Sequence, residues 1–89
     1  MLEFEWDDDN LEHIAAHGVT AADVEFALSN PTIDIEYQDW HEEERFAEAG
    51  VTDKGRVLVV ITTWRGLRIR VVTAFDAPPS VIEEYYRAR

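Results

Sequence analysis

Arginines are the residues of this sequence with the clearest chemical potential. Arg68 and Arg70 stand two apart in a β-branched stretch, so on a strand their side chains would leave the same face about 7 Å apart. A planar guanidinium can meet two phosphate oxygens at once and stabilise the charge that develops during phosphodiester cleavage. Arg45 and Arg56 are further candidates for this role. The simpler interpretation is that these arginines pair across a sheet with carboxylates such as Glu36.

Cleavage of RNA without a metal also needs a base for the 2′-hydroxyl proton and an acid for the leaving oxygen. Histidine suits both roles near neutral pH, and His17 is the candidate. His13 and His17 are four residues apart, so they share a face of a helix. This spacing is also compatible with a metal, but a third ligand and an HExxH motif are missing, so we predict no metal site. In a structural alternative, His17 closes the helix beside Gly18.

Aromatic side chains could stack on splayed RNA bases. Trp40 lies in a polar loop, where burial is hardest to arrange, so it is a candidate contact for RNA or a protein partner. Tyr85 and Tyr86 lie on different sides of the last predicted helix, so at most one is buried and the other can reach the sheet. The predicted catalytic residues are Arg45, Arg70 and His17. The predicted RNA contacts are Arg56, Arg68, Trp40 and Tyr85.

Length and composition limit the remaining possibilities. The 89 residues predict a single domain, 1–89. The absence of cysteine excludes a disulfide framework, a thiolate zinc site and a cysteine nucleophile. The longest apolar run, 57–61, is far below the roughly 20 residues of a membrane span, and no signal-peptide pattern opens the chain. We therefore expect a cytoplasmic protein without a cofactor or a membrane partner.

The net charge of −11 is distributed unevenly along the chain. Residues 1–44 hold 14 acidic and no basic side chains, whereas residues 45–89 hold 5 acidic and 8 basic ones. Such asymmetry predicts an oriented molecule, with one side that repels phosphate and one that tolerates it. A solvated acidic surface, as in a salt-adapted organism, is the alternative explanation.

Hydrophobic periodicity predicts helices in the first third of the chain. Alternation over 2–6 indicates a short strand. The acidic run 7–10 can cap a helix that carries Leu11 and Ile14 and stops at Gly18. Thr20 and Asp23 resemble a capping box that opens a second helix, ended by Asn30-Pro31.

The remainder of the sequence predicts strands and a closing helix. Alternation begins at Ile33, a further strand includes Arg45-Phe46-Ala47, and the stretch 56–64 is apolar enough for a central strand covered on both faces. Another strand, 67–75, follows a tight turn, and Ser80 can cap the last helix. The predicted order β-α-α-β-β-β-β-α is an α+β fold, with an antiparallel sheet packed against helices.

Five segments, in this order, resemble proteins of the BrnT family. They are Phe4-Glu5-Trp6-Asp7, Asn10 to Val19, Glu43-Glu44-Arg45-Phe46, Gly55 to Val60, and Arg68 to Ala74, with Tyr85 near the C-terminal tyrosine of the family. The resemblance covers nearly the whole chain. It implies a RelE-like fold and the toxin half of a type II toxin–antitoxin pair. Such a toxin would be a small ribonuclease that inhibits translation.

The resemblance also implies a partner. A cognate, BrnA-like antitoxin would neutralise the toxin and bind DNA, so contact with DNA would be made only through the antitoxin. The chain departs from the family pattern at Phe75, where the last strand usually continues with arginine, and in a closing helix that is acidic instead of basic.

These departures keep two alternatives open. One is a catalytically degenerate binding module of the same fold, which engages a basic partner protein without cleaving RNA. The other is a protein that acts without a partner and whose acidity is environmental.

Overall fold

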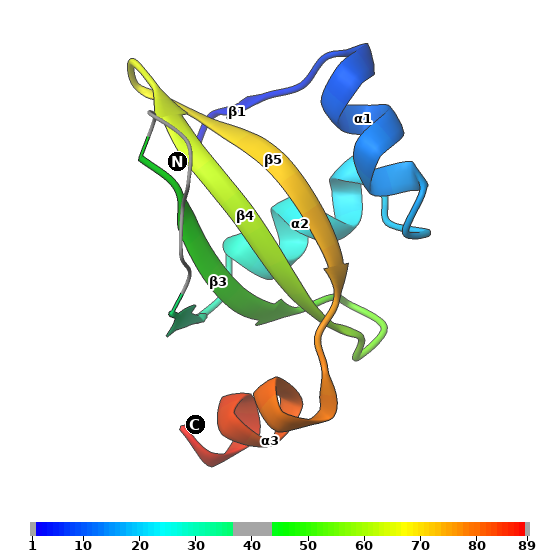
Figure 1. Ribbon diagram of the computed structural model, residues 1–89, viewed down its shortest axis with the longest axis vertical. Coiled ribbons are helices and arrows are strands. Elements are labelled where there is room, and N and C mark those ends of the chain that lie inside the picture. Colours follow the sequence, from blue (N-terminus) through cyan, green and yellow to red (C-terminus); the bar gives the residue numbers. More distant parts are fainter. Residues whose placement is uncertain (1, 37–43, 89) are drawn as a thin grey trace.

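The computed structural model describes residues 2–36 and 44–88 and confirms the predicted element order (Figure 1). The five strands form one sheet in the order β1-β5-β4-β3-β2, in which β1 runs parallel to β5 and all other neighbours are antiparallel. The elements are β1 (Phe4–Glu5), α1 (Asp8–Ala15), α2 (Ala21–Leu28), β2 (Ile33–Ile35), β3 (Phe46–Val51), β4 (Val57–Arg65), β5 (Arg68–Asp76) and α3 (Pro79–Arg87).

The first two helices begin at capping boxes. The Asn10 backbone N–H donates to Asp7 Oδ1 at 3.1 Å, and the Asp7 N–H donates back to Asn10 Oδ1 at 2.8 Å. Thr20 and Asp23 repeat this arrangement at α2, as the sequence predicted. The reciprocal bonds satisfy two helix-end donors each. The expected cap of α3 is wrong, because that helix begins at Pro79 without a side-chain cap.

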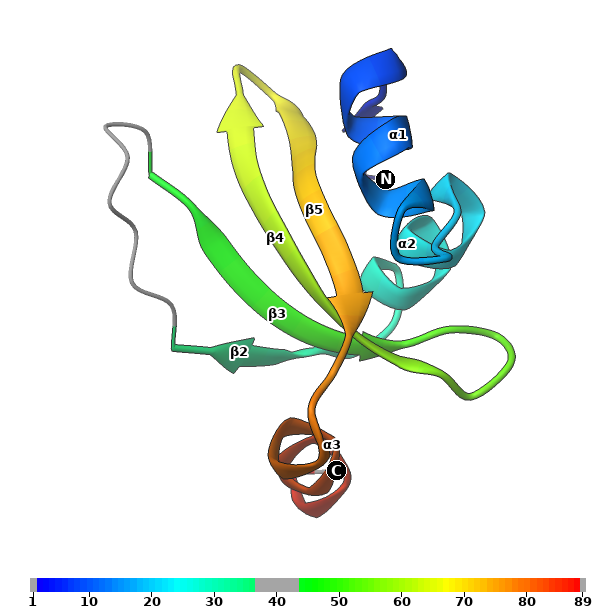
Figure 2. The same cartoon turned by 45° about the vertical axis from the view of Figure 1, so that its right-hand side comes forward.

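The helices pack on both faces of the sheet (Figure 2). Helices α1 and α2 lie on one face, where Ile14 and Val24 join Leu58 and Val60 of β4 in a buried cluster. Helix α3 lies across the opposite face near one end, where Tyr85 joins a second cluster. Strand β4 separates the two clusters, which confirms the prediction of a central strand covered on both faces.

Side chains of β4 alternate between these clusters. Leu58 and Val60 face α1 and α2, whereas Val59 and Ile61 face α3. An irregularity between Ile61 and Thr62 adds one residue to β5 and leaves the alternation of β4 intact. Beyond Ile61, odd-numbered residues of β4 therefore face the α3 side, and even-numbered residues face α1 and α2.

Gly50 sets the distance between α2 and β3. A Cβ atom at this position would lie 2.9 Å from the backbone oxygen of Ala27 and 3.2 Å from the Cγ2 of Thr32. To make room for a Cβ atom, the backbone of α2 or β3 would have to shift, and either shift would loosen the packing between them.

We predict that Gly50→Ala lowers the free energy of unfolding by about 1–3 kcal/mol, because the added methyl group overpacks the contact between α2 and β3. Urea denaturation followed by tryptophan fluorescence measures this loss. The control is Gly55→Ala, where an added Cβ meets nothing within 4 Å and only the positive φ of 84° costs stability. A Gly50→Ala variant as stable as the wild type would contradict the packing role.

Candidate functional site

Four arginines share one face at the end of the sheet formed by the β4–β5 hairpin. Arg70 lies opposite Thr63, and Arg68 lies opposite Arg65. Arg45 directly precedes β3, whose Phe46 lies opposite Thr62, so alternation places Arg45 on the same side as Thr63. Directly opposed residues share a face, and alternation from Ile61 assigns this face to the α3 side. We call Arg45, Arg65, Arg68 and Arg70 the arginine surface.

No helix among the described residues covers the arginine surface. Helix α3 packs near the other end of the same face, below the sheet in Figure 2. Arg65 and Arg68 are exposed and directly opposed, so two like charges face each other at the hairpin. Glu3 lies 3.9 Å from Arg68. Two adjacent guanidinium groups of this kind are suited to bind phosphate.

Sequence reasoning missed Arg65, because it was assigned to a turn. Strand β4 extends through Arg65, and only Gly66 and Leu67 separate it from β5. Gly66 supplies the positive φ of 62° that this two-residue turn requires. If the predicted strand had been extended by one residue, a two-residue turn at Gly66-Leu67 would have placed Arg65 opposite Arg68, on the same face as Thr63.

Arg70 is held by two carboxylates. Its Nη1 donates to Glu5 Oε1 at 2.9 Å and to Asp7 Oδ2 at 2.8 Å, and its side chain is only 16% exposed. The parallel pairing of β1 with β5 places Glu5 beside Arg70. These bonds fix the start of α1 to the sheet. The sequence left pairing with carboxylates open as an alternative, but the partners of Arg70 are Glu5 and Asp7 of the N-terminal segment and not Glu36.

The ion pairs shift the pKa values of their members. The hydrogen bond from Arg70 lowers the pKa of Asp7 below its ordinary value of 3.8, and the backbone N–H of Asn10 adds to this effect. In turn, the hydrogen bond to Asp7 raises the pKa of Arg70, opposed in part by burial and supported by Glu5. Both groups therefore stay charged at neutral pH.

Arg56 does not join the arginine surface. It precedes β4, seven residues from Thr63, which corresponds to about 23 Å along a strand. Its Nη1 and Nη2 donate to the backbone oxygens of Gly18 and His17 at 2.7 and 2.8 Å, and its Nε donates to Asp76 at 2.5 Å. The hydrogen bond from Arg56 lowers the pKa of Asp76. Arg56 therefore clamps the end of α1, away from the arginine surface, and its predicted contact with RNA stays a prediction.

The structure also separates His17 from Arg45 and Arg70. The His17 ring is exposed and lies 6.0 Å from the ring of Phe75, between centroids. Phe75 is five residues beyond Arg70, about 17 Å along β5. The structure therefore does not bring His17 together with Arg45 and Arg70, and a catalytic role for His17 stays a prediction. The backbone carbonyl oxygen of His17 accepts a hydrogen bond from Arg56.

Of the two aromatic residues predicted to contact RNA, only Tyr85 lies among the described residues. Tyr85 is 0% exposed within the cluster beneath α3, and its hydroxyl donates to the backbone oxygen of Pro31 at 3.4 Å. The side chain has no surface to offer RNA, so the predicted contact at Tyr85 is corrected to a core position. Tyr86 is the exposed member of the pair, at 53%. Trp40 lies outside the described residues.

Comparison with known proteins identifies the family. The family model of the ribonuclease toxin BrnT of type II toxin–antitoxin systems matches residues 6–80. The chain belongs to the BrnT family. The match includes α1, α2 and all of β3, β4 and β5, the strands that carry the arginine surface. Comparison with curated proteins and with solved structures gave no match.

Family membership confirms the resemblance seen in the sequence and makes RNA and a cognate antitoxin the expected interaction partners. Phe75, where the resemblance called for arginine, packs in the cluster beneath α3. Its position at the far end of β5 leaves the arginine surface of this BrnT-family chain unchanged.

No described helix is long and apolar enough to cross a membrane.

Asp7 makes the free energy of unfolding depend on pH in the acidic range. Because its pKa is lower in the folded state, Asp7 stabilises the fold fully above about pH 4 and loses this effect as the pH falls through the folded-state pKa. We predict that Asp7→Asn destabilises the protein at pH 7, and that the difference from wild type shrinks below pH 4. Urea denaturation at a series of pH values measures it. Asp53→Asn, in the exposed hairpin turn, is the control and should show a small difference at every pH.

Proposed function

We propose that this chain is a metal-independent endoribonuclease that inhibits translation, binds single-stranded RNA on the arginine surface, and is neutralised by its cognate antitoxin. Two features support this proposal: the BrnT family is a family of ribonuclease toxins, and four arginines share one face at an end of the sheet that no described helix covers. The second of these carries the argument for where the RNA binds.

The exposed arginines have separate roles from Arg70. Arg65 and Arg68 bind the phosphates of the RNA backbone, and Arg45, half-buried at the start of β3, lines the same face. Arg70 is a positioning residue, because both carboxylates that hold it also fix β1 and the start of α1.

Glu5 replaces His17 as the proposed base. It lies on β1 directly beside Arg70, so its carboxylate is at the edge of the arginine surface, with 30% of its side chain exposed. In the proposed step the Glu5 carboxylate takes the proton of a 2′-hydroxyl, whose oxygen attacks the adjacent phosphorus. The bond from phosphorus to the 5′-oxygen breaks, the leaving oxygen takes a proton from water, and a 2′,3′-cyclic phosphate remains.

A second candidate function comes from the same ion pairs. Arg70 is already neutralised by Glu5 and Asp7, so the chain could bind RNA or a basic partner without cleaving RNA. Cleavage by the folded wild-type protein distinguishes the two candidates.

We predict that Arg65→Ala/Arg68→Ala reduces cleavage of a mixed RNA substrate by about 100-fold or more, because phosphate in the transition state loses two cationic donors. The rate is measured from purified protein at low and high KCl. Binding should also become less dependent on salt, by about 0.7 in the logarithmic slope for each phosphate contact that is lost.

The matched control for this double variant is Lys54→Ala/Arg87→Ala, which removes the same charge from the opposite hairpin and from α3. Circular dichroism verifies folding of each protein. Equal loss of cleavage in both double variants would show a general charge effect and contradict RNA binding at the arginine surface.

We predict that Glu5→Gln lowers kcat by about 100-fold or more, because the amide cannot accept the 2′-hydroxyl proton. Asp7→Asn is the control, since it also weakens the hold on Arg70 but leaves the proposed base intact. The measurement is the pH dependence of kcat for all three proteins. If Glu5→Gln keeps the rate and the acidic limb of the wild-type profile, Glu5 is not the base.

A further inference from the structure

Two aromatic side chains are exposed on the other side of the same sheet end. Phe46 is 41% exposed and Trp64 is 54% exposed. Phe46 lies opposite Thr62, two residues before Trp64, so both aromatic side chains leave the α1/α2 side of the sheet. Trp64 lies opposite Ile69, which in turn pairs with Phe4. We call Phe46 and Trp64, backed by Phe4 and Ile69, the aromatic surface.

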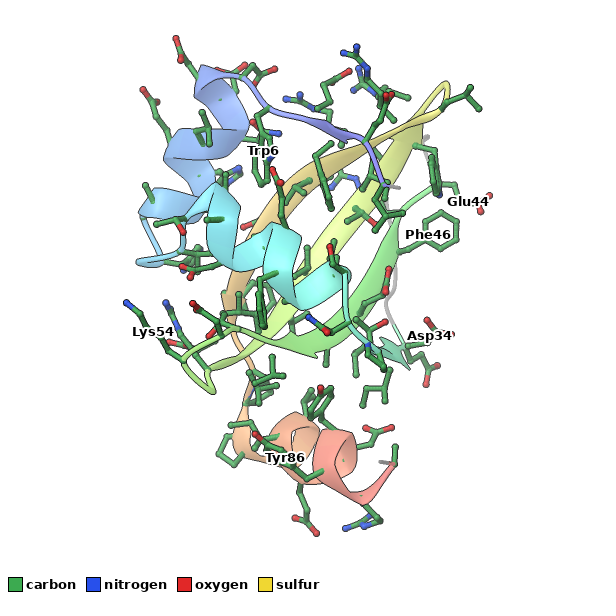
Figure 3. The ribbon with its side chains drawn as sticks, turned by 180° about the vertical axis from the view of Figure 1, so that it is seen from behind. Trp6, Asp34, Glu44, Phe46, Lys54 and Tyr86 are labelled. Atoms are coloured by element: carbon green, nitrogen blue, oxygen red, sulfur yellow. The ribbon has the colours of Figure 1, made fainter. Side chains whose placement is uncertain are left out.

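Neither α1 nor α2 covers the aromatic surface. Figure 3 shows Phe46 at the margin of the sheet, away from the α2 ribbon, with Glu44 next to it. The diagonal spacing between opposed strands, about 7–8 Å, lets two large aromatic side chains present one continuous apolar patch. An exposed patch of this kind, built on rigid strands, is typical of a protein–protein contact.

Carboxylates flank the aromatic surface on the side of β2 and β3. Asp34 of β2 lies directly opposite Glu48 of β3, and Glu48 is two residues from Phe46, so both carboxylates share its face. Glu44 lies beside Phe46 (Figure 3). Directly opposed like charges destabilise a sheet. No ion pair between described residues includes any of these three carboxylates, so a cationic partner would relieve the repulsion.

We propose that the aromatic surface is the docking site for a basic amphipathic segment of the cognate antitoxin. Apolar side chains of that segment cover Phe46 and Trp64, and its lysines or arginines pair with the flanking carboxylates. RNA is a poor occupant, because its phosphates would face Asp34, Glu44 and Glu48. A second copy of the chain is equally poor, because two acidic rims and two net charges of −11 would meet.

This docking site and the arginine surface use opposite sides of the same strands. Trp64 faces α1 and α2, whereas its neighbours Thr63 and Arg65 face the α3 side. The inference rests on membership of the toxin family and not on the proposed cleavage chemistry. Docking of that segment therefore does not depend on Arg65 or Arg68, so substitutions can separate antitoxin binding from RNA binding.

The test is the affinity of purified full-length protein for the purified cognate antitoxin, measured by isothermal titration calorimetry. We expect Trp64→Ser and Phe46→Ser each to weaken binding about 30-fold or more, as for buried aromatic contacts at interfaces. Asp34→Asn/Glu44→Gln/Glu48→Gln should weaken binding at low salt and reduce its salt dependence. This charge variant alters only side chains with exposed surface, so it tests the proposal even if an aromatic variant unfolds.

Arg65→Ala/Arg68→Ala is the matched control and should bind the antitoxin like the wild type. Loss of binding in this control, with binding retained by Trp64→Ser and by the charge variant, would overturn the proposal. A wild-type dimer by light scattering that Trp64→Ser converts to a monomer would assign the surface to self-association instead. RNA cleavage is measured separately without antitoxin, so its absence would contradict the proposed function and leave this inference standing.

Discussion

Alternation of side chains along β4 and β5 is the constraint on which the rest of the structure depends. Where helices lie on both sides, alternation delivers apolar residues to two clusters. At the hairpin end of β4 and β5, which no described helix covers, the alternation continues, so successive side chains lie on opposite exposed faces. Thr63 and Arg65 join the cationic side, whereas Trp64 faces the opposite, aromatic side. A single hairpin thereby presents two chemically different surfaces.

Two arginines tie α1 to the sheet from its two ends. Arg70 holds the N-cap Asp7, and Arg56 holds the carbonyl oxygens of His17 and Gly18 beyond the last turn. Each position suits the helix dipole, because Asp7 places negative charge at the N-terminus and Arg56 places positive charge at the C-terminus. The short helix of eight residues, marginal by itself, gains much of its stability from these contacts.

The acidity of the chain and its membership of a ribonuclease family are compatible because the charges are separated in space. The arginine surface lies on one side of the sheet end, while Asp34, Glu44 and Glu48 flank the aromatic surface on the other. Carboxylates that also approach the arginine surface, Glu3 and Glu5, come from β1. The local field around bound phosphate is thus set by a few neighbours and not by the net charge.

Sequence alone determined the α+β order, the N-cap run before α1, the capping box of α2, the central strand and the shared face of Arg68 and Arg70, since each of these depends on local spacing and local hydrogen bonds. It also sufficed to recognise the family, because five short segments occur in the right order. Tertiary structure alone decided the partners of the other arginines: strand pairing draws Glu5 and Asp7 onto Arg70, and leaves Arg56 and His17 at the far end. Those contacts link residues up to 65 positions apart, and no local periodicity carries information about such pairs.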